Sequence, residues 1–212
     1  FDQTAVIDVD GTAVSYGELR AGVSQAAGLL AGLGVGAGDR VGILAVNRAA
    51  FLEVLFGALS LGATVVPMNY RAGKDEAAHL MADSGTKVLV TESRYQDLVD
   101  SVRPATLEHV LLFDGDYAER RDAAEPNELV EDVDDDALAT LLYTSGTTSL
   151  PKGVMLKHGA ITGYVMGTNE CADGEDHGRM LLAAPLYHVA GLTSTLIALY
   201  SGRVVCMLSQ FD

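Results

Sequence analysis

Short apolar runs that read as β-strands alternate with segments of helical periodicity along the first half of the chain. Strands are predicted at 41–46, 64–67, 87–91 and 109–113, and helices at 49–61, 74–83 and 94–103. Strands that are apolar throughout are typical of parallel sheets, because helices cover both faces of such a sheet. The sequence therefore predicts an α/β fold with mostly parallel sheets covered by helices on both faces.

The two ends of the chain extend this pattern. Near the N-terminus, Asp10-Gly11 separates β-rich runs at 4–9 and 12–16 and predicts a hairpin, which a helix over 16–33 follows. After residue 137, strands are predicted at 139–143, 154–156, 180–183 and 203–208. Helices are predicted at 159–167 and between the last two of these strands.

The most informative stretch is rich in hydroxyl groups and lies between two predicted strands. It reads Tyr143-Thr-Ser-Gly-Thr-Thr-Ser-Leu-Pro-Lys-Gly153. Hydroxyls and closely approaching backbone N–H groups donate hydrogen bonds to anionic oxygens, and a lysine adds a mobile positive charge. Clusters of Ser, Thr and Gly also occur in ordinary loops. Here their order favours a polyphosphate-binding loop formed by Thr144, Ser145, Gly146, Thr147, Thr148 and Lys152.

This stretch differs from the Walker phosphate loop, Gly-x-x-x-x-Gly-Lys-Ser/Thr. Pro151 stands in place of its second glycine, and Gly153 follows the lysine where Ser or Thr would hold magnesium. The sequence therefore indicates a phosphate loop of another kind.

The loop resembles the signature loop of the adenylate-forming superfamily, which includes acyl-CoA synthetases, coumarate–CoA ligases, beetle luciferases and the adenylation domains of peptide synthetases. Ser149 stands where that loop usually has glycine. Asp39-Arg40-Val41, the segment 61–67 and Asn69-x-Arg71 also resemble landmarks of the superfamily, so the resemblance covers essentially the whole chain. It implies that 1–212 is the N-terminal part of an AMP-binding domain.

A second candidate site is Pro185-Leu-Tyr-His-Val-Ala-Gly-Leu192, at a predicted corner between a strand and a helix. Sheets of α/β proteins present ligands at such corners, although a histidine there can instead cap the helix. The stretch is similar to a Pro-Leu/Met-Phe/Tyr-His segment of the superfamily. That resemblance implies that His188 neighbours the reacting centre and that Tyr187 and Ala190 lie beside the carboxylate substrate.

The charge balance argues against nucleic-acid binding. The chain has 29 acidic residues against 14 Lys and Arg residues, a formal net charge of −15, whereas nucleic-acid binders carry a basic face. The two cysteines have no metal-binding spacing, and no metal ligand is predicted. Neither a signal peptide nor an apolar run of membrane-spanning length is present. A soluble, cytoplasmic protein is therefore expected.

The chain divides at a strongly acidic segment. We expect a first α/β half at 1–113, a solvated acidic connection at 114–136 and a phosphate-loop half at 137–212. The superfamily's acidic magnesium ligand, ribose-binding aspartate, hinge and catalytic lysine all lie beyond the equivalent of Asp212. The resemblance therefore implies the front part of a longer enzyme, with little or no turnover by this part alone.

The function implied by the resemblance is that of an ATP-dependent acyl-CoA synthetase, with ATP, Mg²⁺ and CoA as cofactors. The carboxylate of a fatty or aryl acid attacks the α-phosphorus of ATP, and the acyl adenylate then passes its acyl group to CoA. Two alternatives stay open: a peptide-synthetase-type adenylation domain, and a non-catalytic nucleotide-binding or interaction module. Whether the protein forms a homodimer is also left open.

Overall fold

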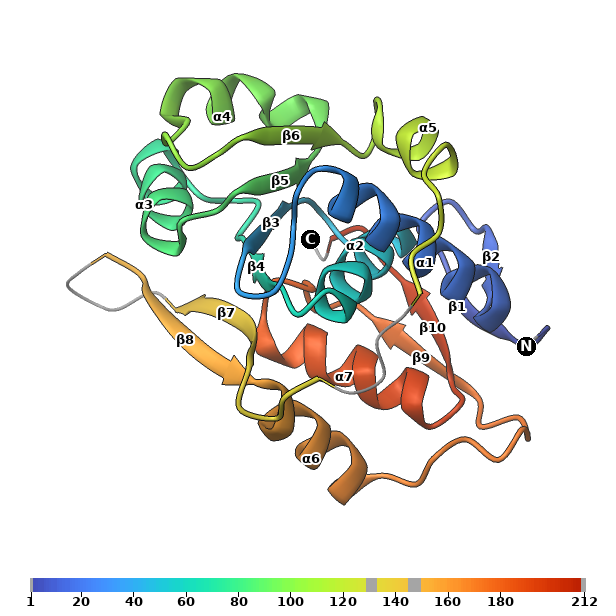
Figure 1. The fold of residues 1–212 in the computed structure, drawn as a ribbon. Helices are drawn as coiled ribbons and strands as arrows, with labels where there is room; N and C mark the ends of the chain where they lie inside the picture. The colour runs from blue at the N-terminus through green and yellow to red at the C-terminus, as the bar shows by residue number, and fades with distance from the viewer. Residues whose placement is uncertain (1, 129–132, 145–149, 211–212) are drawn as a thin grey trace.

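The computed structural model describes residues 2–128, 133–144 and 150–210, which fold into two sheets with helices between and around them (Figure 1). Within these ranges no helix combines the length and the apolar character needed to cross a membrane.

Six strands form the larger sheet, in the order β6-β5-β3-β4-β7-β8. They are β3 (Arg40–Leu44), β4 (Thr64–Pro67), β5 (Val88–Thr91), β6 (His109–Leu112), β7 (Leu138–Thr144) and β8 (Lys152–Lys157). β3 to β7 are parallel to one another, and β8 returns antiparallel to β7. The mostly parallel sheet expected from the apolar runs is confirmed, and the β7–β8 hairpin is its antiparallel part.

Four strands form the smaller sheet, in the order β2-β1-β10-β9. They are β1 (Thr4–Ile7), β2 (Ala13–Ser15), β9 (Arg179–Leu182) and β10 (Val204–Met207). β1 pairs antiparallel with β2, as the Asp10-Gly11 signal predicts, and parallel with β10, where Val6 lies opposite Val205. Each sheet therefore combines strands from both sides of the acidic segment.

Helices cover both faces of the larger sheet (Figure 1). On one face, α1 (Tyr16–Gly32) and α2 (Ala49–Ser60) share a buried cluster with strands of both sheets. On the other face, α3 (Lys74–Ser84) and α4 (Gln96–Val102) form a second buried cluster. Alternate residues of one strand join different clusters, as for Val65 and Val66 of β4, because successive side chains point to opposite faces.

Two further helices follow the β7–β8 hairpin, and one predicted helix begins differently from expectation. α6 (His158–Thr168) comes directly after β8, and α7 (Val189–Tyr200) connects β9 to β10. The helix predicted at 94–103 starts with a 3-10 turn, η1 (Ser93–Tyr95), and becomes α-helical only from Gln96.

The acidic segment contains a helix that the sequence pattern does not predict, α5 (Tyr117–Asp122). Tyr117 is buried, and its hydroxyl donates to Glu53 Oε2 at 3.0 Å. Arg121 Nη1 donates to both carboxylate oxygens of Glu53, at 2.8 and 2.6 Å. A buried carboxylate is tolerated only when it is paired. Glu53, on α2, therefore fastens α5 to the core.

Candidate active site

The hydroxyl-rich loop connects the two strands of the β7–β8 hairpin. Thr144 ends β7 and lies opposite Lys152, the first residue of β8. Residues in such a cross-strand pair project to the same face of the sheet, with Cβ atoms about 5 Å apart. Both side chains are exposed, and Lys152 forms no ion pair with another described residue. The hairpin thus presents a hydroxyl and an ammonium group together where the loop begins and ends.

The centre of the predicted phosphate loop lies outside the described residues. This applies to Ser145, Gly146, Thr147 and Thr148, and also to Ser149, so the role expected of them stays a prediction. Gly153, directly after the lysine, is described. A Cβ at this position would lie 2.7 Å from Leu141 Cδ1 on the opposite strand. A side chain at this position would therefore require the end of the Leu141 side chain to move.

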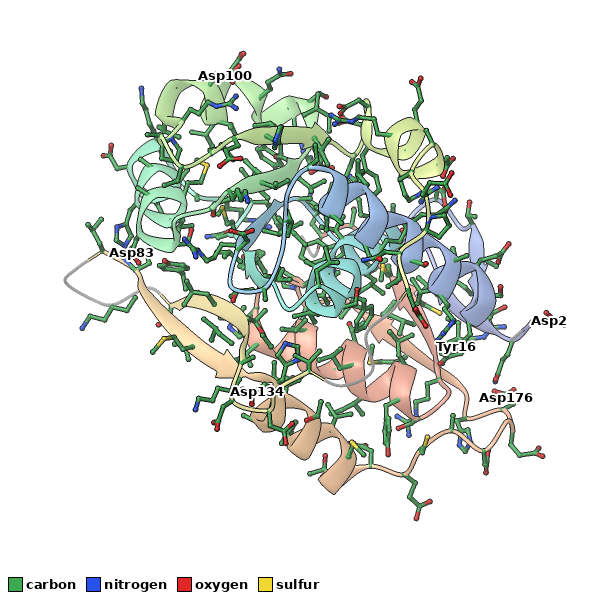
Figure 2. The ribbon with its side chains drawn as sticks, viewed as in Figure 1. Asp2, Tyr16, Asp83, Asp100, Asp134 and Asp176 are labelled. Atoms are coloured by element: carbon green, nitrogen blue, oxygen red, sulfur yellow. The ribbon has the colours of Figure 1, made fainter. Side chains whose placement is uncertain are left out.

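Two side chains of α3 that the sequence does not mark as functional contact this hairpin. His79 Nε2 is 2.8 Å from the carbonyl oxygen of Pro151, and Tyr143 donates its hydroxyl to Asp83 Oδ2 at 2.6 Å. Figure 2 shows Asp83 at the end of α3 that faces the hairpin. The sequence gives His79 an ordinary helical context, and only the spatial arrangement reveals its contact beside Lys152.

The corner that carries His188 lies at the start of α7. His188 is the N-cap residue, and its Nδ1 accepts a hydrogen bond from the Ala190 backbone N–H at 3.2 Å. The capping role considered from the sequence is therefore present. Because Nδ1 accepts, the proton of the neutral ring lies on Nε2. His188 and Ala190 are both exposed, so the corner can offer the imidazole as a hydrogen-bond donor beside a small side chain.

Tyr70 connects this corner to the edge of the larger sheet. It follows β4 and packs edge-on against Tyr187, with ring centroids 5.4 Å apart and planes at 81°. Burial raises the pKa of the Tyr187 hydroxyl, which therefore stays protonated at neutral pH. β4 is parallel to its neighbour β7, so the segment after β4 and Thr144 at the end of β7 share one sheet edge (Figure 1). This is the carboxyl edge, where α/β sheets bind ligands.

Lys152 of the hairpin and His188 of the corner lie at the same edge of the sheet, and they do not bond to each other directly. No hydrogen bond or ion pair within the described ranges joins Lys152 to His188.

Asn47 holds the corner in place and is missed by the sequence pattern. It is 1% exposed, and its side-chain N–H₂ group donates to the carbonyl oxygens of Ala184 and Leu208 at 3.1 and 3.0 Å. Its Oδ1 accepts from the Leu186 backbone N–H at 2.8 Å. One buried amide therefore ties the end of β3 to the segment that leads into His188.

Exchanging Asn47 for aspartate tests the contribution of these hydrogen bonds to stability. Asn47→Asp preserves the side-chain shape but replaces the N–H₂ group with an oxygen, which cannot donate to the carbonyl oxygens of Ala184 and Leu208. We expect it to lower the free energy of unfolding of the intact protein by about 2 kcal/mol, because unsatisfied buried polar groups cost about 1–3 kcal/mol. Chemical denaturation measures the change.

Asn69→Asp is the matched control. Asn69 is only partly buried, and its Oδ1 accepts from the Arg71 backbone N–H, a bond that a carboxylate also accepts. We expect a change of less than about 0.5 kcal/mol. Equal stability of the two variants would contradict the role assigned to Asn47.

The described residues suit a phosphate ligand better than an isolated metal ion. Within the described ranges, no group of three or more His, Cys, Asp or Glu side chains could hold a metal ion. Thr144 and Lys152 supply a neutral donor and a cation, which fit anionic oxygens. Magnesium is commonly held by substrate phosphates together with one or two carboxylates. Lys152 would therefore contact the phosphates of such a complex rather than the ion itself.

Comparison with known families matches residues 1–212 to AMP-binding enzymes. The chain belongs to the AMP-binding enzyme family. The resemblance seen in the two sequence motifs is thereby confirmed at the level of the family.

Curated relatives of this AMP-binding enzyme chain include acid–CoA ligases of two kinds. Feruloyl-CoA synthase of an Amycolatopsis species is 38% identical over 203 residues, covering 95% of the chain and 40% of the relative. The long-chain-fatty-acid–CoA ligase FadD13 of Mycobacterium tuberculosis H37Rv is 32% identical over 204 residues, covering 94% of the chain and 40% of the relative. The chain thus spans 40% of the length of these relatives.

Solved structures confirm the fold class. The inhibitor-bound N-terminal domain of FACL13 from Mycobacterium tuberculosis matches the chain with a TM-score of 0.91 and 30% sequence identity. The match covers 100% of the chain and 54% of the FACL13 structure. Apo MatB from Rhodopseudomonas palustris matches with a TM-score of 0.87 at 24% sequence identity. That match covers 100% of the chain and 43% of the MatB structure. The expected α/β architecture is therefore that of the N-terminal domain of FACL13.

Proposed function

We propose that this AMP-binding enzyme chain is the ATP-binding part of an acid–CoA ligase. The observation that carries the proposal is the cross-strand pair of Thr144 and Lys152, which flanks the hydroxyl-rich loop at the carboxyl edge of the sheet. The names of the relatives support a carboxylic acid and CoA as the other two substrates.

In the proposed first step, a carboxylate oxygen of the acid forms a bond to the α-phosphorus of ATP. The bond from that phosphorus to the bridging oxygen breaks, and pyrophosphate leaves with the electron pair. Lys152, Thr144 and the loop donors predicted between them would stabilise the negative charge that develops on the leaving group. Magnesium would neutralise part of the phosphate charge when it is bound.

In the proposed second step, the CoA thiol loses its proton to solvent and its sulfur forms a bond to the acyl carbon. The bond from that carbon to the phosphate oxygen breaks, and AMP leaves with the electron pair. His188, with its proton on Nε2, would donate a hydrogen bond near the reacting carboxyl group. Tyr187 and Ala190 would line the acid-binding side of the corner. The small side chain of Ala190 leaves room for a long or bulky acid, and the relatives include ligases for an aryl acid and for fatty acids.

Acid-dependent exchange of pyrophosphate into ATP tests the proposal in the intact protein. We expect exchange with a fatty or an aryl acid, and formation of the matching CoA thioester when CoA is added. Residues 1–212 alone should show little or no turnover, because they span only part of the length of their relatives.

Each alternative predicts a different result in the same assay. Exchange that depends on an amino acid, followed by loading of a carrier protein, would instead support a peptide-synthetase-type adenylation domain. Binding of ATP with no exchange for any acid would support a non-catalytic module.

A further inference from the structure

The far end of the β7–β8 hairpin reaches beyond the strand that supports it. β4 pairs with β7 at Thr140, four residues before Thr144. β4 continues for two residues beyond Val65, the partner of Thr140, so β7 extends two residues past its end, or about 7 Å at about 3.3 Å per residue. Among the described strands, β8 pairs with β7 alone, and most of its residues are exposed. The sheet by itself therefore leaves the position of Lys152 weakly determined.

One face of α3 contacts β7 and the residue that precedes β8. His79 and Asp83 are four residues apart and lie on the same side of the helix. Asp83 accepts the hydroxyl of Tyr143 from β7, and His79 contacts the Pro151 carbonyl just before β8. The rings of His79 and Tyr143 also pack edge-on, with centroids 6.0 Å apart and planes at 85°. We call these four residues the α3 latch.

The polarity of each contact follows from its partner. A carbonyl oxygen only accepts, so His79 must donate to Pro151 from Nε2. Desolvation, and then the hydrogen bond to Asp83, raise the pKa of the Tyr143 hydroxyl. Tyr143 therefore keeps its proton at neutral pH and continues to donate to Asp83.

The contact of His79 fixes the peptide group that leads directly into Lys152. Pro151 already restricts its own φ angle. A hydrogen bond to its carbonyl oxygen further fixes the orientation of the peptide plane, and with it the direction in which the next side chain leaves the backbone. A shift of about 1 Å in a positioned group can cost a large factor in rate.

We propose that His79 is a positioning residue for phosphate binding, acting through Pro151 to aim Lys152 at the triphosphate of ATP. This inference rests on the proposed function, because it assigns His79 to the same site. It separates His79 from the buried residues of α3, which contribute to the core of the second cluster.

His79→Phe in the intact protein tests the proposal, because it preserves the ring next to Tyr143 and removes only the donor. We expect KM for ATP to rise about tenfold, the equivalent of one lost hydrogen bond, while KM for the acid stays within about twofold. His79→Gln places an N–H₂ group near the position of Nε2, and we expect it to restore KM for ATP to within about threefold of the wild type.

His177→Gln is the matched control. His177 is an exposed histidine that pairs with Asp173, outside the latch and the candidate site. We expect its kinetic constants to equal those of the wild type.

Two results would overturn the proposal: an unchanged KM for ATP in His79→Phe, or equal losses in His79→Phe and His79→Gln. If His79→Phe does not fold, His79→Ala decides, since it also removes the donor to the Pro151 carbonyl. A KM for ATP raised about tenfold then supports the proposal, and wild-type constants refute it.

Failure of the proposed function would be visible separately. If the wild type shows no acid-dependent exchange, calorimetry with ATP still tests His79. An about tenfold weaker Kd for ATP in His79→Phe supports the latch, and an unchanged Kd, or no binding to the wild type, overturns it.

Discussion

Lys152→Ala in the intact protein is expected to lower acid-dependent pyrophosphate exchange by about 10²-fold or more. Lys152 is exposed, lies opposite Thr144 and has no ion-pair partner among the described residues. Its charge is therefore available to the leaving pyrophosphate, where removal of one preorganised donor typically costs 10²–10³ in rate. Steady-state exchange at saturating acid, with ATP varied, measures the loss.

Lys157→Ala is the control for this substitution. Lys157 ends the same strand, is exposed and pairs with the exposed carboxylate of Asp136. We expect its exchange rate to match that of the wild type, because surface ion pairs contribute little. An unchanged rate in Lys152→Ala would count directly against a phosphate-binding role for this lysine.

Arg121→Ala is expected to destabilise the intact protein by about 3 kcal/mol. The substitution removes the guanidinium that donates to both carboxylate oxygens of Glu53, a residue with only 8% of its surface exposed. Removing one partner of a buried ion pair leaves an uncompensated charge and typically costs about 3–5 kcal/mol. We choose the lower limit because Tyr117 still donates to Glu53. Denaturant unfolding followed by circular dichroism measures the effect.

The adjacent Arg120→Ala separates this effect from the loss of any arginine in α5. Arg120 pairs with Asp116 on the surface, with both side chains substantially exposed. We expect a change of less than about 0.5 kcal/mol. If Arg120→Ala and Arg121→Ala were equally stable, Glu53 would not depend on the cation for its burial.

The sequence predicts most of the fold because its strands are apolar on both faces, and this pattern depends only on local residues. It does not predict α5, a segment of six residues in an acidic surrounding. What stabilises α5 is the pairing of Tyr117 and Arg121 with Glu53, which lies more than 60 residues earlier. A contact between residues so far apart in the sequence produces no periodic pattern of apolar residues. The sequence also does not predict that β8 runs antiparallel to β7, because no two-residue turn signal of a hairpin stands between them.

The candidate site likewise contains residues that the sequence predicts and residues that only the structure reveals. Lys152 and His188 are predicted as site residues from the sequence, because residue types in a short motif indicate their chemistry. Asn47 and His79 are missed because each acts on backbone carbonyl groups of distant segments, and every residue type presents such a group. The structure also assigns Nδ1 of His188 to the cap of α7, which the motif left open.

The pairing of β1 with β10 has a consequence for the order in which the protein folds during synthesis. Val6 leaves the ribosome about 200 residues before its partner Val205. At 5–20 residues per second, the interval is about 10 to 40 seconds. β3 to β6 can meanwhile assemble, since they lie within residues 40–112. The β1–β2 hairpin therefore has an unpaired edge, open to misassembly, until β10, the last of the described strands, emerges.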